Sequence, residues 1–340
     1  SSTPHASGQR KVGFLSLRTK LALVFGLLAF VSGLVQGGIL VVLARSSVIR
    51  EISSHLADRA RDTSAIVEGR IGALFQFLEG LARLEVLQGS SDRRRAQVDR
   101  LGREAFFNRD ITRLAVVDRA GVLYAEDGST HYVQDRKYFQ QAVKGRRYVS
   151  APYRSRSSND MVITFSVPVY GEDRQIIAVL AADVIWTWLC DITGDFSVGG
   201  TGKSAIFDEV GTIVAHPRHE VVEQQTNYIR LAKEDPATYA SVSEFVEKII
   251  KSDSVGSHAF SHEGSEKIGS YAKMKSTGWT VVVFATVSEF MGPVYTLQNY
   301  LLAVGIIVVL FSLIVVYAVA RKIVRPLRST VRVLEDIAYG

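Results

Sequence analysis

The stretch LAVVDRAGVLYAED, residues 114–127, determines the expected fold, because its pattern returns as SAIFDEVGTIVAHP, residues 204–217. In both copies an apolar run leads to an Asp, a Gly follows three positions later, and a second apolar run comes next. Such an Asp-x-x-Gly step is turn chemistry, since Asp bonds the local backbone and Gly permits positive φ. Each copy is therefore predicted to be a β-hairpin, one in each of two related modules.

Each predicted hairpin is followed by a second pair of strand-like runs. MVITFSVPVYGEDRQIIAVLAADV, residues 161–184, comes after the first copy, and KIGSYAKMKSTGWTVVVFATV, residues 267–287, comes after the second. The segment IWTWLCDITGDF, residues 185–196, connects the two modules. These patterns favour an α+β fold with two antiparallel sheets, each carrying helices and loops on one face.

Residues 45–87 contain no Pro and are predicted to form a long amphipathic helix ahead of the first hairpin. Its apolar positions mostly keep the three- and four-residue spacing of one helix face; they are Ile49, Ile52, Leu56, Ile66, Ile71, Leu74, Leu78, Leu81 and Leu84. One face of this helix can pack on its own domain. The more specific interpretation is that the helix also forms a dimer contact with a second copy of the chain, and the two interpretations are compatible.

Two polar segments are predicted to face solvent. SSDRRRAQVDR, residues 90–100, has the composition of a solvated loop and helix start. SVGSHAFSHEGS, residues 254–265, is interpreted as a polar loop in which His258 and His262 are solvated. The single cysteine, Cys190, lies between apolar neighbours and is interpreted as a small buried residue rather than a redox or intermolecular group.

Two uncharged stretches are long enough to cross a membrane. Residues 21–44 and 298–320 each reach the roughly 20 apolar residues that a spanning helix requires. A cleaved signal peptide is the alternative for the first, since Val42, Leu43 and Ala44 resemble a cleavage site. Its apolar run is longer than a typical signal-peptide core. The chain begins without Met, and we expect it to be a fragment with further cytoplasmic sequence after Gly340.

Basic residues beside these stretches predict the topology. They are Arg10, Lys11, Arg18 and Lys20 before the first, and Arg321, Lys322, Arg325, Arg328 and Arg332 after the second. The positive-inside rule then places both termini in the cytoplasm and the middle outside. Much of the formal charge of +6 sits in these flanks, where anionic lipid explains it. Without a basic helix with interleaved aromatics, nucleic-acid binding is not expected.

The chain resembles the double Cache family, the extracytoplasmic sensor module of bacterial transmembrane receptors. The resemblance rests on the long helix, the segments DRKYF and APYRSRSSNDMVITFSVPVYG, the strand IIAVLAADV, and the phrases GKSAIFDEVGTIVAHP and TGWTVVV. It implies two PAS-like modules stacked along the long helix and flanked by two transmembrane helices. RKIVRPLRSTVRVLEDIAYG is similar to the opening of a HAMP domain, and Pro326 with the apolar spacing after it fits a helix restart.

The expected organisation follows from the resemblance and the two spans. A short cytoplasmic segment precedes the first span, the double Cache domain lies between the spans, and the HAMP start follows the second. The domain itself divides into the long helix, a membrane-distal ligand-binding module and a membrane-proximal module. The boundaries are 1–20 for the cytoplasmic segment, 21–44 for the first span, 45–297 for the sensor (45–87, 88–185 and 186–290 for its three parts), 298–320 for the second span and 321–340 for HAMP.

The amino-acid-binding branch of this family implies where a ligand would bind. Its Arg-x-aromatic-aromatic segment, which holds the ligand carboxylate, corresponds to Arg136, Tyr138 and Phe139, and the Asp that holds the ligand amine corresponds to Asp183. Physical chemistry agrees, because an Arg fork fits a carboxylate with two bonds and Tyr rings supply contact area plus a hydroxyl. The full set of candidate ligand-binding residues is Tyr132, Arg136, Tyr138, Phe139, Tyr153, Ser155 and Asp183.

The match to that branch is partial. The branch has a Tyr five residues before the Arg, whereas here His131 holds that place and Tyr132 follows it. The acid expected two residues after Tyr153 is replaced by Ser155. Arg156 adds a cation, so the ligand could be an organic acid as well as an amino acid. In the alternative interpretation Arg136 forms a structural ion pair with Asp135 or Asp160, and Arg154 and Arg156 are solvated loop charges.

Catalytic and metal chemistry are not expected. SVGGTGKS, residues 197–204, nearly fits a phosphate-binding loop, but Ser197 replaces its first Gly and the segment opens a strand. AHPRHE, residues 215–220, matches no helical zinc spacing. No Ser-His-Asp or paired-carboxylate arrangement stands out, so the chain is interpreted as a non-enzyme without cofactors.

The sequence thus favours a ligand-sensing receptor of the bacterial inner membrane, a methyl-accepting chemotaxis protein that passes through the membrane twice. Its expected partners are a small amino acid or carboxylate, membrane lipid, a second copy of the chain, and cytoplasmic signalling proteins. A histidine kinase or diguanylate cyclase with the same sensor is the first alternative. A membrane-anchored adhesion or scaffold protein is the second, and the HAMP-like start argues against it.

Overall fold

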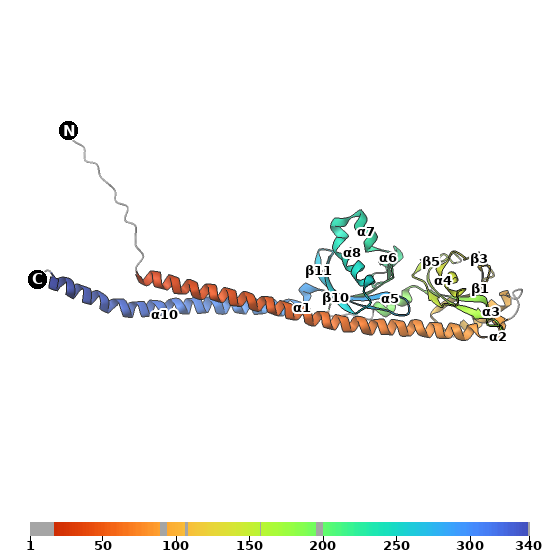
Figure 1. The fold of residues 1–340 in the computed structure, drawn as a ribbon, viewed down its shortest axis with the longest axis horizontal. Coiled ribbons are helices and arrows are strands. Elements are labelled where there is room, and N and C mark those ends of the chain that lie inside the picture. Colours follow the sequence, from red (N-terminus) through yellow and green to blue (C-terminus); the bar gives the residue numbers. More distant parts are fainter. Residues whose placement is uncertain (1–16, 89–93, 106–107, 157, 195–199, 339–340) are drawn as a thin grey trace, which may run out of the picture. The chain divides into compact units, whose positions relative to one another are not determined.

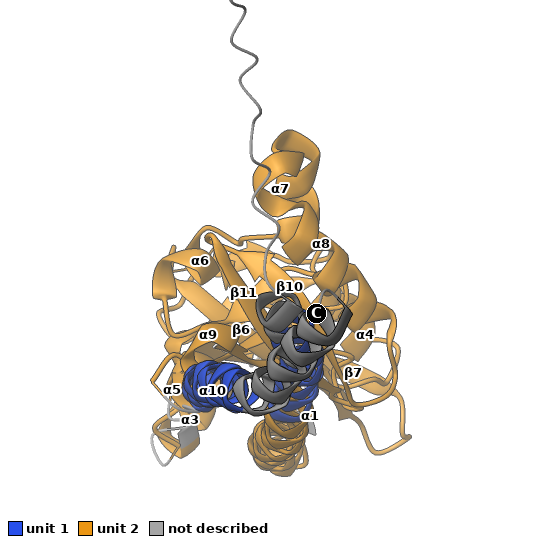
Figure 2. Cartoon of the chain, turned by 90° about the vertical axis from the view of Figure 1, so that its left-hand side faces the viewer, with its two compact units in different colours: residues 1–48, 290–340 blue, residues 49–289 orange. Residues whose placement is uncertain are grey.

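A computed structural model of the chain describes residues 17–88, 94–105, 108–156, 158–194 and 200–338. The chain divides into two compact units (Figure 2). One comprises residues 1–48 and 290–340, and the other is Ile49–Glu289, which contains both sheets. The predicted cytoplasmic N-terminal segment lies almost entirely outside the described residues.

The first unit is built from two apolar helices. Helix α1 (Leu17–Ala82) passes without a break from the first apolar stretch into the predicted amphipathic helix, and α10 (Gly292–Ala338) contains the second apolar stretch. Both are long and apolar enough to cross a membrane. They approach closely, since a Cβ added at Gly26 would lie 3.2 Å from Leu313 Cδ2. The predicted helix restart at Pro326 is wrong, because α10 continues through it.

The distal module carries a seven-stranded antiparallel sheet along α1 (Figure 1). Its order is β3-β2-β1-β7-β6-β4, with β5 also paired to β6. The strands are β1 (Ile111–Asp118), β2 (Val122–Ala125), β3 (Thr130–Tyr132), β4 (Tyr148–Val149), β5 (Tyr153–Arg154), β6 (Met161–Tyr170) and β7 (Ile176–Ile185). The helices are α2 (Glu85–Gln88), α3 (Arg94–Ala105) and α4 (Lys137–Ala142).

The proximal module carries a five-stranded antiparallel sheet in the order β10-β11-β12-β8-β9. The strands are β8 (Lys203–Phe207), β9 (Ile213–Ala215), β10 (Gly256–His262), β11 (Ser265–Lys273) and β12 (Thr280–Thr286). The helices are α5 (Thr187–Gly194), α6 (His219–Glu223), α7 (Tyr228–Glu234), α8 (Pro236–Lys251) and α9 (Val287–Phe290). The predicted α+β fold with two antiparallel sheets is confirmed.

The two repeated hairpins form as their turn residues predict. Asp118 Oδ1 accepts the backbone N–H of Val122 at 2.9 Å, and Gly121 has φ +80. In the second copy Asp208 Oδ1 accepts from Thr212 at 2.7 Å. Gly211, three residues after Asp208, has φ +84, a left-handed conformation that is unfavourable for a residue with a side chain. Strands β1 and β2, and likewise β8 and β9, therefore pair across equivalent turns.

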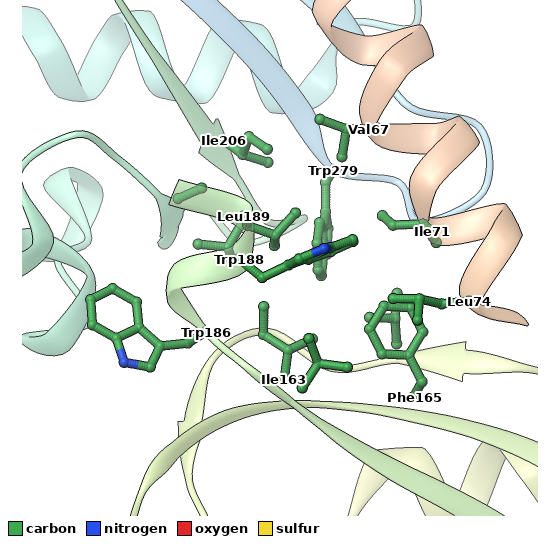
Figure 3. Packing of buried hydrophobic residues seen from close by; sticks show 14 of the residues in the cluster. Val67, Ile71, Leu74, Ile163, Phe165, Trp186, Trp188, Leu189, Ile206 and Trp279 are labelled. Atoms are coloured by element: carbon green, nitrogen blue, oxygen red, sulfur yellow. The ribbon is translucent and has the colours of Figure 1, made fainter. Parts of the chain in front are cut away.

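Trp188 of α5 lies where α1 and side chains of both modules meet (Figure 3). Its ring is 6.1 Å from that of Phe165 on β6, edge to face, and Phe165 in turn lies 5.2 Å from Phe75 of α1. On α1 most of the predicted apolar face is buried, with Ile71 only 1% exposed, but Ile66 and Leu84 are exposed at 41% and 39%. Cys190 is buried beside this cluster, which agrees with its interpretation as a small core residue.

The prediction that the basic segment before β1 is solvated is wrong for Arg94. Arg94 is buried, and its guanidinium donates to Gln97 Oε1 at 2.9 Å and to the carbonyl oxygen of Ile177 at 3.3 Å. These contacts pair both terminal nitrogens of the buried guanidinium, whereas its Nε has no hydrogen-bond partner among the described residues. Residues 89–93 lie outside the described part of the chain.

The predicted polar loop at residues 254–265 is also corrected, because most of it forms strand β10 at the edge of the proximal sheet. His258 is exposed, as predicted. His262 instead turns inward, where its ring lies 5.0 Å from the ring of Tyr228. The two histidines are four residues apart on β10 and so lie on the same face of the strand. Their environments differ because Tyr228 covers His262.

Phe165 provides a test of the junction at Trp188. Its side chain is fully buried, so Phe165→Ala should lower the free energy of unfolding by about 3–5 kcal/mol through lost transfer energy and a cavity. The measurement is chemical unfolding of the purified chain in detergent. Val210→Ala, at a position that is 62% exposed, should change stability by less than about 0.5 kcal/mol. Equal effects of the two substitutions would contradict the described packing.

Candidate ligand-binding site

A small cavity lies on one face of the distal sheet, between β1, β6 and β7 and the segments that contain α4 and β5. Its free volume is about 20 Å³, which is room for about one water molecule. The lining side chains are Arg113, Ala115, Leu123, His131, Val133, Arg136, Tyr138, Tyr153, Ser155, Arg156, Thr164, Ala181 and Asp183.

The floor of the cavity is a row of residues set by strand register. Arg113 of β1 pairs with Asp183 of β7, and Asp183 pairs on its other side with Thr164 of β6. The Thr164 hydroxyl donates to Asp183 Oδ1 at 2.6 Å. The Tyr153 hydroxyl lies 2.7 Å from Thr164 Oγ1 and must donate to it, since the only Thr164 hydroxyl proton is already used. A chain of hydrogen bonds therefore runs from the Tyr153 hydroxyl through the Thr164 hydroxyl to the Asp183 carboxyl group.

Aromatic rings and Arg136 form the wall above this floor. The Arg136 guanidinium carbon lies 4.9 Å from the centroid of the Tyr153 ring, a cation–π contact. Tyr138 stacks near Tyr153 with ring centroids 6.4 Å apart. Burial raises the pKa of Tyr153 to about 12 and raises that of Tyr138 further, so both keep their hydroxyl protons at neutral pH.

Asp183 is the buried carboxyl group of the site. Burial raises the pKa of its carboxyl above the ordinary 3.8, against the opposing effects of the Thr164 hydrogen bond and of the Arg113 charge. The raised pKa means that these two partners do not fully replace the water lost by the carboxylate. A positively charged ligand group in the cavity would stabilise the ionised form.

The rim of the cavity carries an ion pair, which we call the mouth pair, between Arg156 and Asp135. Arg156 donates to Asp135 Oδ1 at 2.9 Å and to Oδ2 at 2.7 Å, a bidentate arrangement. Another hydrogen bond links Arg156 to the carbonyl oxygen of Tyr132 at 3.3 Å. Both charged side chains are about half exposed. The mouth pair ties the segment after β5 to the turn before α4.

Five of the candidate residues meet at this cavity. Arg136, Tyr138, Tyr153, Ser155 and Asp183 all line it.

Tyr132 and Phe139 do not line the cavity. Tyr132 is 75% exposed on the short edge strand β3, where strand alternation turns His131 inward instead. Phe139 follows Tyr138 on α4, and both belong to the small core cluster, but only Tyr138 also lines the cavity. Asp135, a suggested partner of Arg136, pairs with Arg156.

Sequence reasoning missed two residues of the floor, Arg113 and Thr164. Each lies directly opposite Asp183 on a neighbouring strand. Thr164 is the polar member of the apolar run MVITF, which is the signal that could have identified it. Among the described residues no group of three or more His, Cys, Asp or Glu side chains is placed to hold a metal ion.

Comparison with known proteins identifies the class. The sequence profile of the Cache domain matches residues 43–294, which is most of the chain, and the chain belongs to this family. The predicted resemblance is thereby confirmed.

Two curated relatives fall within one class of receptor. A probable methyl-accepting chemotaxis protein of Bacillus thuringiensis subsp. konkukian is 24% identical over 211 residues, and so is the methyl-accepting chemotaxis protein McpA of Bacillus subtilis. Each match covers 61% of this chain and 28% of the relative. The chain thus spans little more than a quarter of the length of these relatives.

Solved structures of chemoreceptor sensor domains share the fold. The sensory domain of the Campylobacter jejuni chemoreceptor Tlp3 with isoleucine bound has a TM-score of 0.54 at 16% identity, over 72% of this chain and 97% of that one. The ligand-binding domain of the Pseudomonas aeruginosa amino acid chemoreceptor PctB with L-Arg has a TM-score of 0.56 at 16% identity, over 72% and 98%. At this identity the likeness concerns the fold.

Asp183→Asn tests the buried carboxyl group. The variant keeps the acceptor for Thr164 and removes the charge. Because folding raises the pKa of Asp183 above 3.8, the wild type loses stability as pH rises from about 3.8 through the raised value, and the variant does not. We expect the variant to have the higher unfolding midpoint at pH 7, with a difference that shrinks toward pH 4. The measurement is thermal unfolding across that range.

Asp191→Asn is the matched control, since Asp191 is exposed. It should leave the pH profile unchanged. An Asp183→Asn variant that is less stable than the wild type throughout the range would contradict this description of the site.

Proposed function

We propose that this chain is the sensor and membrane part of a bacterial chemoreceptor that binds a small amino acid or organic carboxylate in its distal module. The observation that carries the proposal is the cavity where Arg136, two tyrosines and the buried Asp183 converge. The names of the curated relatives, which are methyl-accepting chemotaxis proteins, support the receptor class over a kinase or cyclase. The sensor domains with isoleucine and L-Arg bound support an amino acid ligand.

Two of the charged groups that line the cavity match the two ends of an amino acid. Arg136 offers a planar fork of donors for a carboxylate, and Asp183 offers an acceptor for an ammonium group. A ligand ammonium would also offset the desolvation that raises the pKa of Asp183. Ser155 and Tyr138 also line the cavity and add hydroxyl groups to its wall. A ligand without an ammonium group would bind Asp183 less well.

Ligand entry requires the cavity to expand. Small-molecule sites have volumes of about 300–1,000 Å³, whereas the distal cavity has about 20 Å³ of free volume. The segments with α4 and β5 are the parts that can separate, because the exposed mouth pair joins them at the rim. Ligand would therefore favour an expanded state over the contracted one, and this differential affinity supplies the free energy of the signal.

The proposed route of the signal is the membrane part of the chain. Two apolar helices flank the Cache domain, and the basic residues beside them favour cytoplasmic termini and an external sensor in the inner membrane. A HAMP domain from residue 321 would pass the change to cytoplasmic signalling proteins. The part described would act by binding and not by catalysis.

A homodimer is part of the proposal. The side of α1 that faces away from its own core is exposed and rich in small residues, including Ala65, Gly69, Ala73 and Gly80. Their spacing keeps them on one helix face, where a second helix can approach closely.

The pocket is tested by screening the purified chain in detergent against amino acids and organic acids by thermal shift, followed by calorimetry of any ligand found. Arg136→Ala should weaken binding about tenfold to a hundredfold, because hydrogen bonds to a charged group are lost. Arg154→Ala is the control, since Arg154 is exposed and its guanidinium donates to the Asn159 carbonyl oxygen. A ligand that binds wild type and Arg136→Ala equally would refute the assignment.

The dimer is tested with a cysteine on the small-residue face of α1. Ala73→Cys should give a disulfide-linked dimer on mild oxidation of membranes, because Cα atoms across a close helix pair come within disulfide reach. The native Cys190 is buried and should not react. Arg70→Cys, which is exposed outside that face, should cross-link far less. Equal cross-linking at both positions would indicate random collision in place of a specific seam.

A further inference from the structure

The proximal module contains a cavity much larger than the distal one. Its free volume is about 350 Å³, within the range of small-molecule sites. It lies against the sheet face formed by β8, β10, β11 and β12, and α7 and α8 contribute lining residues from the other side. Neither the fold nor the proposed amino acid site requires an open space of this size in the proximal module.

The internal repeat relates the two cavities position by position. Arg113 and Lys203 each lie five residues before the turn Asp of their hairpin, and both line their cavity. Arg113 is paired across strands with Asp183, whereas Lys203 is paired with Phe284. The proximal cavity thus keeps the cation of this row and has an aromatic ring where the distal cavity has its carboxylate.

Basic groups dominate the polar lining of the proximal cavity. Lys267 is largely buried, with 13% of its side chain exposed, and its ammonium lies 5.8 Å from the centroid of the Phe284 ring. Glu263 is the one acidic side chain among the described lining residues. It is about half exposed, is bonded to Arg218 at 3.0 Å and lies 3.7 Å from the Lys267 ammonium. The interior therefore has a largely buried cation whose acidic partner is a half-exposed carboxylate at the edge of the cavity, and no buried carboxylate is present among the described lining residues.

Two histidines add neutral polar groups. His216 Nδ1 accepts the backbone N–H of Arg218 at 2.9 Å. Burial lowers the pKa of His216 to about 4, so the ring is neutral at pH 7 and carries its proton on Nε2. His262 has a buried Nδ1 with no hydrogen-bond partner among the described residues, and such an atom is usually satisfied by water or a ligand.

The remaining wall is flat and apolar. The rings of Phe245 and Phe260 stack with centroids 4.4 Å apart, and Phe284 lies edge to face with Phe260 at 6.3 Å. This arrangement depends on Gly269, because a Cβ there would lie 2.5 Å from Phe245 Cζ. Aromatic faces of this kind favour a flat ligand that stacks or meets them edge to face.

We propose that the proximal module binds a small monocarboxylate with a flat apolar body, an arylcarboxylate, at a second site separate from the distal cavity. The carboxylate lies with Lys267 and Lys203, and the body lies among Phe245, Phe260 and Phe284. An amino acid is disfavoured, because its ammonium group would face basic side chains with no buried carboxylate to accept its hydrogen bonds. The proposal does not depend on the ligand of the distal cavity.

The test is calorimetric titration of the full chain, in detergent, with benzoate, phenylacetate and benzylamine. We expect the two carboxylates to bind and the ammonium compound to give no heat. Lys267→Met should raise the dissociation constant about tenfold or more, since a charged hydrogen bond is lost while the apolar stem is kept. Arg136→Ala, in the distal cavity, should leave arylcarboxylate binding unchanged.

Three outcomes would overturn the proposal. They are the absence of heat with both carboxylates at millimolar concentration, equal binding by wild type and Lys267→Met, and loss of binding in Arg136→Ala. Thermal unfolding without ligand shows whether each variant is folded. If Lys267→Met is not folded, Lys203→Met at the exposed start of β8 is used in its place, with the same expected loss.

Discussion

The antiparallel pairing of β1 with β7 is the constraint on which the rest of the distal module depends. It sets Arg113 opposite Asp183, and the pairing of β7 with β6 sets Thr164 on the other side. The same ladder turns Leu114 and Leu180 toward the large core shared with α1. Because side chains alternate along a strand, a slip of one residue would exchange the core and cavity faces completely. The packing of the core and the lining of the candidate cavity are therefore specified by one register.

The proximal module uses the same ladder for different chemistry. Lys203 is opposite Phe284, and Phe284 is opposite Gly269, where the distal row has Arg113, Asp183 and Thr164. Because the proximal row has neither the carboxylate nor the hydroxyl of the distal row, its floor is apolar, with the Lys203 ammonium at one end. The missing Cβ of Gly269 then leaves space for two phenyl rings. A duplicated backbone thus supports two cavities that differ in charge and in the shape they can accept.

Much of the fold could be predicted from the sequence because its signals are local. The repeated Asp-x-x-Gly turns, the apolar strands and the helix period each act over a few residues, and all of them form. Strand β10 was missed because an edge strand with one solvated face contains His258, Ser257 and Ser261, which have the composition of a loop. The burial of Arg94 was missed because one of its partners, the carbonyl of Ile177, is distant in sequence.

The candidate site was predictable only in part, for a related reason. Arg136, Tyr138 and Tyr153 fall in a recognisable order along the chain, and Asp183 ends a strand run. Which side chains share a face depends on register and helix phase, and these separate Tyr138 from its neighbour Phe139. Thr164 belongs to the site only because β6 lies beside β7 with that residue level with Asp183. Such pairings arise from tertiary contacts that a single sequence does not contain.

The mouth pair has a consequence for the environment in which the protein works. Arg156 and Asp135 are exposed, so dissolved salt screens their attraction over a Debye length of about 8–10 Å at moderate ionic strength. The charges beneath the rim are shielded by protein and are screened less. Dissolved salt would therefore weaken the mouth pair more than it weakens the hydrogen bonds beneath the rim.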